Sequence, residues 1–204
     1  MRSIFVSIAL LCFFTTQSFA EENTSKPEAE YAFLLGGSAF GPSGSFVYHS
    51  SQKTSWAFSL GGNPDLDIEL DIEDDSYEVT SESSWVGAFV NHRPFKQASW
   101  IRFVAGLGVG RIDNTIKRST NGFLEDQYEA VYNESPFGYL GLGFGMKPVK
   151  GFIWGVDIGW LQTSGPEVRG LTNDATEERI DAIKHSFWFG SVLPNVQVSV
   201  GYGF

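Results

Sequence analysis

Residues 194–204 read PNVQVSVGYGF, and their alternation is the strongest structural signal in the chain. Apolar or aromatic side chains occupy every second position from Val196 to Phe204, and Gln, Ser and Gly fill the positions between them. A β-strand turns these two sets to opposite faces. A segment of about ten residues is also the length that a tilted strand needs to cross a membrane. The pattern therefore predicts a membrane-spanning strand with its apolar set towards lipid and its polar set inside a barrel.

The same alternation recurs in three glycine-rich stretches upstream, 101–109, 138–146 and 152–160. The positions predicted to face lipid are Ile101, Phe103, Ala105, Leu107 and Val109; Leu140, Leu142, Phe144 and Met146; and Phe152, Trp154, Val156, Ile158 and Trp160. The opposite positions are mostly glycine, and small inward residues allow strands to curl into a narrow barrel. Arg102 and Asp157 interrupt the glycines, and we expect them to pair inside the lumen.

These patterns predict an all-β fold, an eight-stranded, antiparallel, up-and-down transmembrane β-barrel over residues 31–204. The strands are expected at 31–40, 44–51, 54–72, 76–92, 99–116, 126–147, 151–163 and 194–204. An even number of strands returns the C-terminus to the periplasmic side, so the loops after the first, third, fifth and seventh strands face outward. The aromatic girdles at the membrane interfaces are expected to include Tyr48, Trp56, Trp100, Trp154, Trp160 and Tyr202.

The first 20 residues have the features of a secretory signal peptide. A single charge, at Arg2, precedes a short apolar run, and small residues lead up to a cleavage point after Ala20. The run is too short for a membrane helix, which needs about 20 apolar residues. We expect residues 1–20 to be removed and residues 21–30 to form a flexible periplasmic lead-in. The single cysteine, Cys12, lies in the removed part, so the mature chain has neither a disulfide nor a thiolate site.

The charge of the chain argues against nucleic acid as a partner. It carries 24 acidic and 14 basic side chains, a formal net charge of −10. Binding to phosphate backbones relies on clustered Lys and Arg. No stretch after the signal peptide reaches the roughly 18 consecutive apolar residues of a helical span. The sequence therefore indicates an exported β-rich domain, which we place in the cell outer membrane.

Acidic and apolar side chains alternate in the region from Asp65 to Glu82. The alternation predicts a hairpin that extends the third and fourth strands beyond the membrane. Its row of carboxylates is either a solvated acidic surface or a place where divalent cations such as calcium collect. No pair of His or Cys residues has the spacing of metal ligands, so no metal or cofactor is assigned.

The last outward loop is predicted to contain a helix over residues 174–193. Asn173 or Asp174 suits its N-cap, and Pro194 would end it. Apolar residues recur at helical spacing at Ile180, Ile183 and Phe187. Such a helix either packs against the rim or binds a partner, and the sequence leaves open whether it lies above the rim or in the lumen.

Several stretches together resemble a known family. They read SPFGYLGLGFG at 135–145, KGFIWGVDIGWLQTSGPEV at 150–168 and PNVQVSVGYGF at 194–204, and the stretches at 67–95 and 101–113 are similar too. The chain resembles the small proteobacterial outer-membrane β-barrel proteins, the OmpA/OmpW-like eight-stranded barrels. The resemblance implies the outer membrane and the barrel fold, without an agreed activity. Gly203 stands where the family usually has an arginine before the final phenylalanine.

We expect a structural or surface-interaction role, without a pore and without catalysis. Eight strands leave an interior that side chains fill. The expected partners are outer-membrane lipid, both lipopolysaccharide and phospholipid, and the barrel-assembly machinery that reads the C-terminal strand; an extracellular partner is left unidentified. Two alternatives stay open, a lipid A-modifying barrel enzyme and a soluble lipocalin-like periplasmic binder.

The three histidines do not form a recognisable catalytic set. A catalytic serine needs a base within reach. His185 adjoins Ser186, but neighbours on a helix project about 100° apart and do not face each other. His49 is expected at an inward position of the second strand, and His92 at the membrane-edge end of the fourth. No catalytic, cofactor-binding or metal-binding residue is therefore assigned.

Overall fold

The computed structural model of the protein describes residues 28–72, 75–120, 123–172 and 175–204. The predicted signal peptide lies outside these residues, as does most of the predicted lead-in. The described strands and helix are β1 (Tyr31–Ser38), β2 (Gly41–His49), β3 (Thr54–Ile72), β4 (Asp75–His92), β5 (Ile101–Thr120), β6 (Phe123–Gly145), β7 (Gly151–Gln162), β8 (Glu167–Gly170), α1 (Glu177–Lys184) and β9 (Val192–Gly203).

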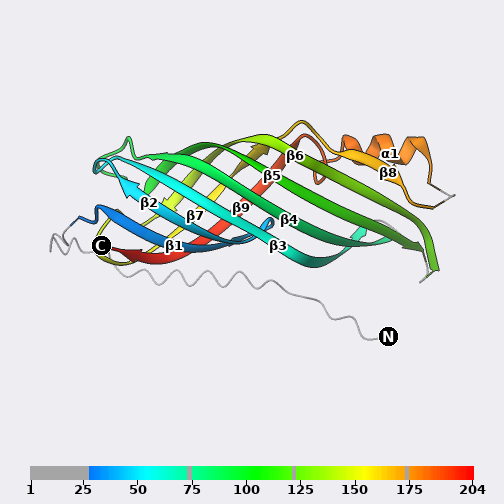
Figure 1. The fold of residues 1–204 in the computed structure, drawn as a ribbon, viewed down its shortest axis with the longest axis horizontal. Helices are drawn as coiled ribbons and strands as arrows, with labels where there is room; N and C mark the ends of the chain where they lie inside the picture. The colour runs from blue at the N-terminus through cyan, green and yellow to red at the C-terminus, as the bar shows by residue number, and fades with distance from the viewer. Residues whose placement is uncertain (1–27, 73–74, 121–122, 173–174) are drawn as a thin grey trace.

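Eight of these strands form a closed antiparallel ring (Figure 1). The hydrogen-bonded order is β5-β4-β3-β2-β1-β9-β7-β6, and pairing between β5 and β6 closes it. The first and last strands of the barrel pair directly, with Phe33 opposite Tyr202. In lipid, a barrel must close in this way because its backbone N–H and C=O groups find no water to bond. The predicted eight-stranded up-and-down barrel is confirmed.

The predicted division into two faces is also confirmed. Leu60, Leu107 and Leu140 expose 67%, 73% and 65% of their surface on the outside of the ring. A soluble protein would bury most of these large apolar side chains, whereas a barrel turns them to hydrocarbon. Inward neighbours such as Val104 are buried. The six residues predicted for the girdles are all exposed: Tyr48, Trp56, Trp100, Trp154, Trp160 and Tyr202.

Met146 departs from the predicted alternation. It was assigned to the lipid face, but it packs against the inward cluster that contains Ala32, Val47 and Ile153. The reason is that β6 ends at Gly145, where φ is +150°. Beyond this glycine the chain turns, and the strand alternation no longer sets the direction of the next side chain.

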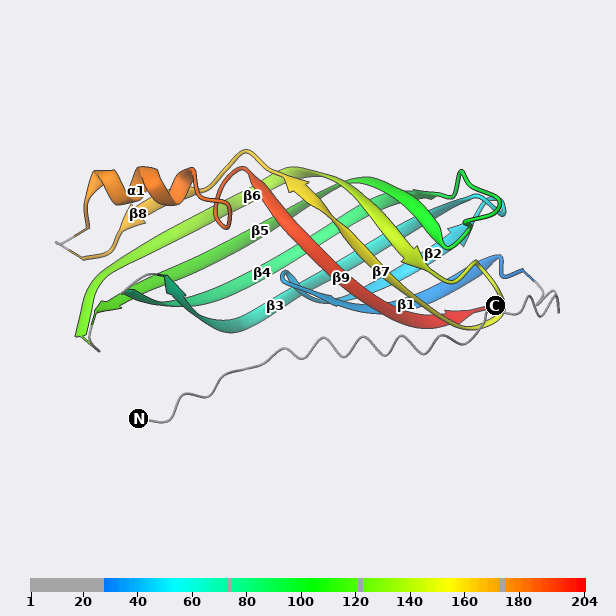
Figure 2. The same ribbon diagram turned by 180° about the vertical axis from the view of Figure 1, so that it is seen from behind.

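Four strands continue well beyond the others and carry the remaining elements. β3, β4, β5 and β6 have 19, 18, 20 and 23 residues, against 8 to 12 in the other strands of the ring. Their far ends project past one mouth of the barrel, together with β8 and α1 (Figures 1 and 2). We call this part the extension. It lies at the end opposite the C-terminus, which is the predicted extracellular side.

The last outward loop differs from its prediction in three ways. The helix covers only Glu177–Lys184, and Thr176 is its N-cap, accepting a hydrogen bond from the Arg179 N–H. The predicted caps at 173 and 174 lie outside the described residues. Pro194 belongs to β9, opposite Trp160 of β7, because pairing with β7 draws the chain into the sheet from Val192 onward. The short strand β8, beside the outer part of β6, was not predicted.

At the end of the barrel nearer the C-terminus, the residues just before β1 lie against the turn between β6 and β7. Glu28 forms an isolated bridge with Val149, and the Ala29 N–H donates to Pro148 O at 3.2 Å. Ala29 is 3% exposed. The last residues of the predicted lead-in are thus fastened across the turn between β6 and β7. Among the described residues, no helix has the length and apolar character that crossing a membrane requires.

The outward face of β5 offers a test of the membrane assignment. Leu107→Arg places a charge in the apolar belt and is expected to lower the free energy of unfolding by about 2–4 kcal/mol. Thr115→Arg lies on the same face of the same strand but in the extension, and we expect a much smaller loss. Urea unfolding of the protein folded in lipid vesicles measures both. Equal losses from the two substitutions would contradict a lipid-facing belt at Leu107.

Candidate functional site

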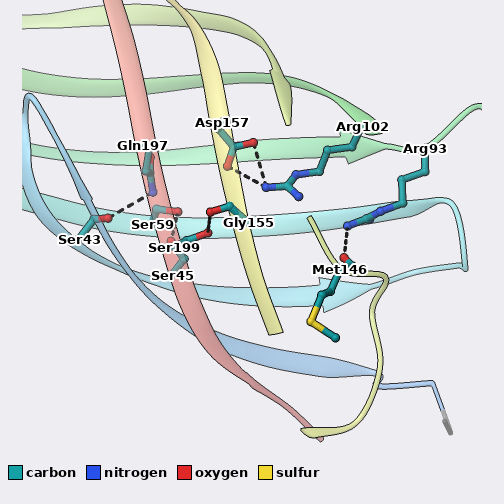
Figure 3. A network of polar contacts seen from close by, with 10 residues as sticks. All are labelled: Ser43, Ser45, Ser59, Arg93, Arg102, Met146, Gly155, Asp157, Gln197 and Ser199. Atoms are coloured by element: carbon teal, nitrogen blue, oxygen red, sulfur yellow. Dashed lines mark hydrogen bonds and ion pairs between the residues drawn. The ribbon is translucent and has the colours of Figure 1, made fainter. Parts of the chain in front are cut away.

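An ion pair lies on the inner wall of the barrel between β5 and β7, as predicted. The Arg102 Nη2 lies 2.9 Å from Asp157 Oδ1 and 2.8 Å from Oδ2. The two side chains are 9% and 15% exposed, so little solvent screens them. Gly143 of β6 lies between them in the register and leaves the space they occupy, because a Cβ there would collide with both side chains. A glycine and a charged pair together fill this level of the barrel, and Figure 3 shows the charged pair.

A second polar group lies beside the ion pair. Ser45 and Ser59 share a hydrogen bond of 2.7 Å between their hydroxyl groups. The Gln197 amide donates to Ser43 Oγ at 3.4 Å, and the Ser199 hydroxyl donates to the Gly155 carbonyl at 3.3 Å (Figure 3). Small hydroxyl side chains of β2, β3 and β9 therefore lie buried on the inner wall.

Apolar side chains close the lumen towards the extension. The buried members of this cluster are Val104, Tyr132, Phe137, Tyr139, Leu161 and Leu193, and Phe40, Trp85, Phe89 and Ile112 pack against them. Tyr132 is fixed by donating to the Gly190 carbonyl at 3.2 Å. The space left in the lumen is a cavity of about 140 Å³. A volume of this size holds on the order of ten water molecules, spread between the polar and apolar levels.

Arg93 is a buried lumen residue that the sequence analysis missed. It follows β4 directly, is 7% exposed, and its Nη2 donates to the Met146 carbonyl at 3.2 Å. Arg93 and Arg102 both line the lumen cavity. The sequence did carry a signal for it. Arg93 continues the inward series of β4, two positions after Asn91, but the predicted fourth strand ended at residue 92.

The histidines are distributed as expected, and within the described residues none is hydrogen-bonded to a serine hydroxyl. His49 lines the lumen near Arg93. His92 is exposed, with its Nδ1 3.0 Å from Thr54 Oγ1. His185 is exposed at the C-cap of α1, where its Nδ1 donates to the Asp181 carbonyl at 2.8 Å, and the Ser186 hydroxyl donates to the Ile183 carbonyl. These arrangements place His92 and His185 in local structural contacts.

The acidic hairpin forms as predicted from the outer parts of β3 and β4. Asp67, Glu69 and Glu78 are exposed, while Val79 on the other face is buried. The Thr80 hydroxyl donates to Asp67 at 2.7 Å, and Lys117 lies 3.5 Å from Glu78. Within the described residues, no three His, Cys, Asp or Glu side chains group as a metal site would need. The calcium alternative therefore gains no geometric support there, and residues 73–74 lie outside the described part.

A buried carboxylate joins α1 to the extension. Asp126 of β6 is 2% exposed and accepts hydrogen bonds from Arg118 Nε at 2.8 Å and from the Tyr128 hydroxyl at 3.0 Å. The Arg179 Nε of α1 lies 3.7 Å from the same carboxylate. Burial, and then the hydrogen bond to Asp126, raise the pKa of Tyr128, which keeps it protonated as a donor. This cluster was not predicted, because its members lie in three different elements.

An apolar cluster completes the attachment of the helix. Its buried members are Val79, Ile116, Tyr128, Ala130 and Val168, and Ile180 and Ile183 of α1 pack against them. The predicted apolar spacing is correct for these two isoleucines, whereas Phe187 lies past the end of the helix and is 63% exposed. Figure 2 shows α1 alongside the outer part of β6 and β8. The helix therefore lies above the rim and not in the lumen.

Comparison with solved structures identifies the fold. No protein-family model matches the chain, and no curated protein matches it. CarO of Acinetobacter baumannii aligns with a TM-score of 0.68 at 18% identity, over 86% of this chain and 98% of that one. CarO2 of the same organism aligns with a TM-score of 0.64 at 14% identity, over 88% and 99%. Both are eight-stranded outer-membrane β-barrels.

This chain has the fold of small outer-membrane β-barrels. The apolar belt and the structural likeness together support the predicted location in the cell outer membrane. At these levels of identity the likeness describes the fold, and the roles of individual residues come from the geometry of this chain alone.

The level of the ion pair yields a stability test. Gly143→Ala adds a methyl group where Arg102 and Asp157 meet, and it should separate them. Breaking a buried pair costs about 3–5 kcal/mol. Gly138→Ala is the matched control, because a Cβ at Gly138 on the same strand meets nothing within 4 Å. The two variants are unfolded in urea, and the folded fraction is measured by heat-dependent gel migration. Similar unfolding curves for Gly143→Ala and Gly138→Ala would argue against a structural role of the ion pair.

The buried Asp126 yields a local test. Asp126→Asn removes the charge that faces Arg118 and Arg179, and we expect α1 to open more readily from the sheet while the barrel itself stays folded. The measurement is hydrogen exchange of the amides in 177–184, which should be about tenfold faster or more, corresponding to about 1.4 kcal/mol. Asp181→Asn alters an exposed carboxylate on the same helix and serves as the control. Unchanged protection in Asp126→Asn would show that the apolar contacts alone hold α1.

Proposed function

We propose that this protein is a non-conducting outer-membrane barrel whose role is structural or surface interaction, carried by the extension. The observation that supports this most directly is the construction of the extension as a packed unit. Four strands extend beyond the membrane-spanning part, and a helix is fixed to them by both an apolar cluster and a buried carboxylate. Ordered structure of this kind above a membrane suits contact with a partner.

The filling of the lumen supports the absence of a pore. The Arg102–Asp157 pair and the hydroxyl groups occupy one level, and the aromatic cluster around Tyr132 and Phe137 occupies the next. The cavity that remains between these side chains measures about 140 Å³. The lipid environment, including lipopolysaccharide and phospholipid, and recognition of the C-terminal strand by the assembly machinery belong to the same proposal.

The surface of the extension favours a partner that carries positive charge. Asp67, Glu69, Glu78 and Glu82 expose their carboxylates on the outer wall, and Lys117 compensates part of this charge. Complementary charge increases the rate of association with such a partner and makes it sensitive to salt. The exposed Phe187 and Trp188, whose rings meet edge to face at 5.2 Å, add an apolar element that follows α1.

Conductance measurements test the proposal. The purified protein reconstituted in planar bilayers should show no steady open channel, because its lumen is filled. Removing the apolar level with Tyr132→Ala and Phe137→Ala together should produce conductance, provided that heat-dependent migration shows that the double variant folds. Steady conductance of the unaltered protein would contradict the non-conducting role. A changed lipid A mass spectrum upon overproduction would instead support the enzymatic alternative, and recovery in the soluble periplasmic fraction would support the lipocalin-like one.

A further inference from the structure

A row of polar side chains lines the lumen at its periplasmic end. His49 of β2 lies opposite Ser55 of β3, and Ser55 lies opposite Asn91 of β4. Arg93 follows Asn91 on the same inward face. All four line the cavity, and so do Arg102 and Asp157 at the next level. The row therefore brings hydrogen-bond donors from three neighbouring strands to one small space.

The charge in this space is out of balance. Arg93, Arg102 and Lys147 line the cavity, against the single carboxylate of Asp157 among its lining residues. Both oxygens of that carboxylate accept from Arg102. The lumen is thus positive, although the chain as a whole carries a net charge of −10. A buried cation without a counter-charge is unfavourable, because its lost hydration is not replaced.

The hydrogen bonding of these groups is also incomplete. A guanidinium group has five N–H donors. Arg93 is 7% exposed, its Nη2 donates to Met146 O, and its Nε has no partner among the described residues. Both ring nitrogens of His49 are buried and likewise without a partner in the described part of the chain. Buried donors are rarely left unmatched in folded proteins, so these positions indicate a group that accepts hydrogen bonds.

We propose that the periplasmic end of the lumen is a binding site for a small oxyanion, a free phosphate or carboxylate, held chiefly by Arg93. The planar guanidinium matches the oxygens of either group, and the His49 N–H and the Ser55 hydroxyl can donate beside it. The anion supplies the negative charge that Asp157 does not provide. The site is distinct from the extension and does not depend on the role proposed for it.

The alternatives explain less of the geometry. Anchoring the Met146 carbonyl needs one neutral donor and does not require a buried charge. A lipid phosphate would need an opening wide enough for acyl chains, and Glu28 and Ala29 are bonded to Val149 and Pro148 at this end of the barrel. A small free anion meets no such requirement.

Histidine signals provide a site-specific test, because the chain has three histidines and one of them lines this cavity. The full protein is extracted in non-ionic detergent with isotope-labelled histidine, and inorganic phosphate is added at constant ionic strength. The chemical shifts of His49 should change with phosphate concentration until they reach a plateau. Those of His92 and His185 should change no more than they do when chloride is added instead. Acetate in place of phosphate shows whether carboxylates bind as well. No saturable movement of His49 with either anion would overturn the proposal.

Two substitutions at Arg93 and one control locate the site. Arg93→Gln should weaken the binding that moves His49 by about tenfold or more, since a charge-assisted bidentate contact is lost. Lys117→Gln removes the same charge from the extension and should leave binding unchanged. If Arg93→Gln fails to fold, Arg93→Lys keeps the charge without the planar fork and should still bind more weakly than the unaltered protein. A folded Arg93 variant that binds phosphate as strongly as the unaltered protein would refute the site. A change of the His49 signals with anionic phospholipid, but not with free anions, would refute it as well.

Discussion

The closure of the backbone hydrogen bonds is the constraint on which the rest of the structure depends. Within hydrocarbon each N–H and C=O must be bonded inside the protein, so the sheet joins β1 to β9 and β5 to β6 and leaves no edge in the membrane. Outside the membrane the constraint no longer applies. There β3 to β6 continue as an open sheet; β8 pairs with the outer part of β6, and α1 packs against the sheet. The ring is closed where hydrocarbon surrounds it, and the extension can stay open because water can bond its backbone groups.

Closing eight strands also determines which side chains fit inside. The interior is narrow enough that large residues on one strand require small residues on the next. Gly143 stands between Arg102 and Asp157, and a Cβ at Gly155 would approach the Arg102 guanidinium at 2.8 Å. The inward glycines therefore have a packing role beside the charged residues. The inward charged side chains fit inside the barrel because the neighbouring inward positions are glycines.

The sequence predicts well what depends on local alternation, and poorly what depends on contacts between distant elements. The eight strands, the two faces and the Arg102–Asp157 pair follow from a period of two along each strand. Local signals misplaced Met146 and the ends of the helix, because a turn at Gly145 and pairing of β9 with β7 override them. Asp126 has no distinguishing neighbours in the sequence; its importance arises where β5, β6 and α1 meet.

Negative side chains lie at the outer end of the barrel and positive side chains at its periplasmic end. This distribution of charge indicates from which side an anion would reach the proposed site. Carboxylates are exposed on the outer wall of β3 and β4 in the extension, and the aromatic level around Tyr132 lies between that region and the polar half of the lumen. An anion from outside would meet repulsion first and an apolar barrier second. From the periplasm it would meet Lys147, which lines the cavity and is exposed, and then Arg93. In the low dielectric of the lumen these cations act over longer distances than in water, so the field favours entry of anions from the periplasmic side.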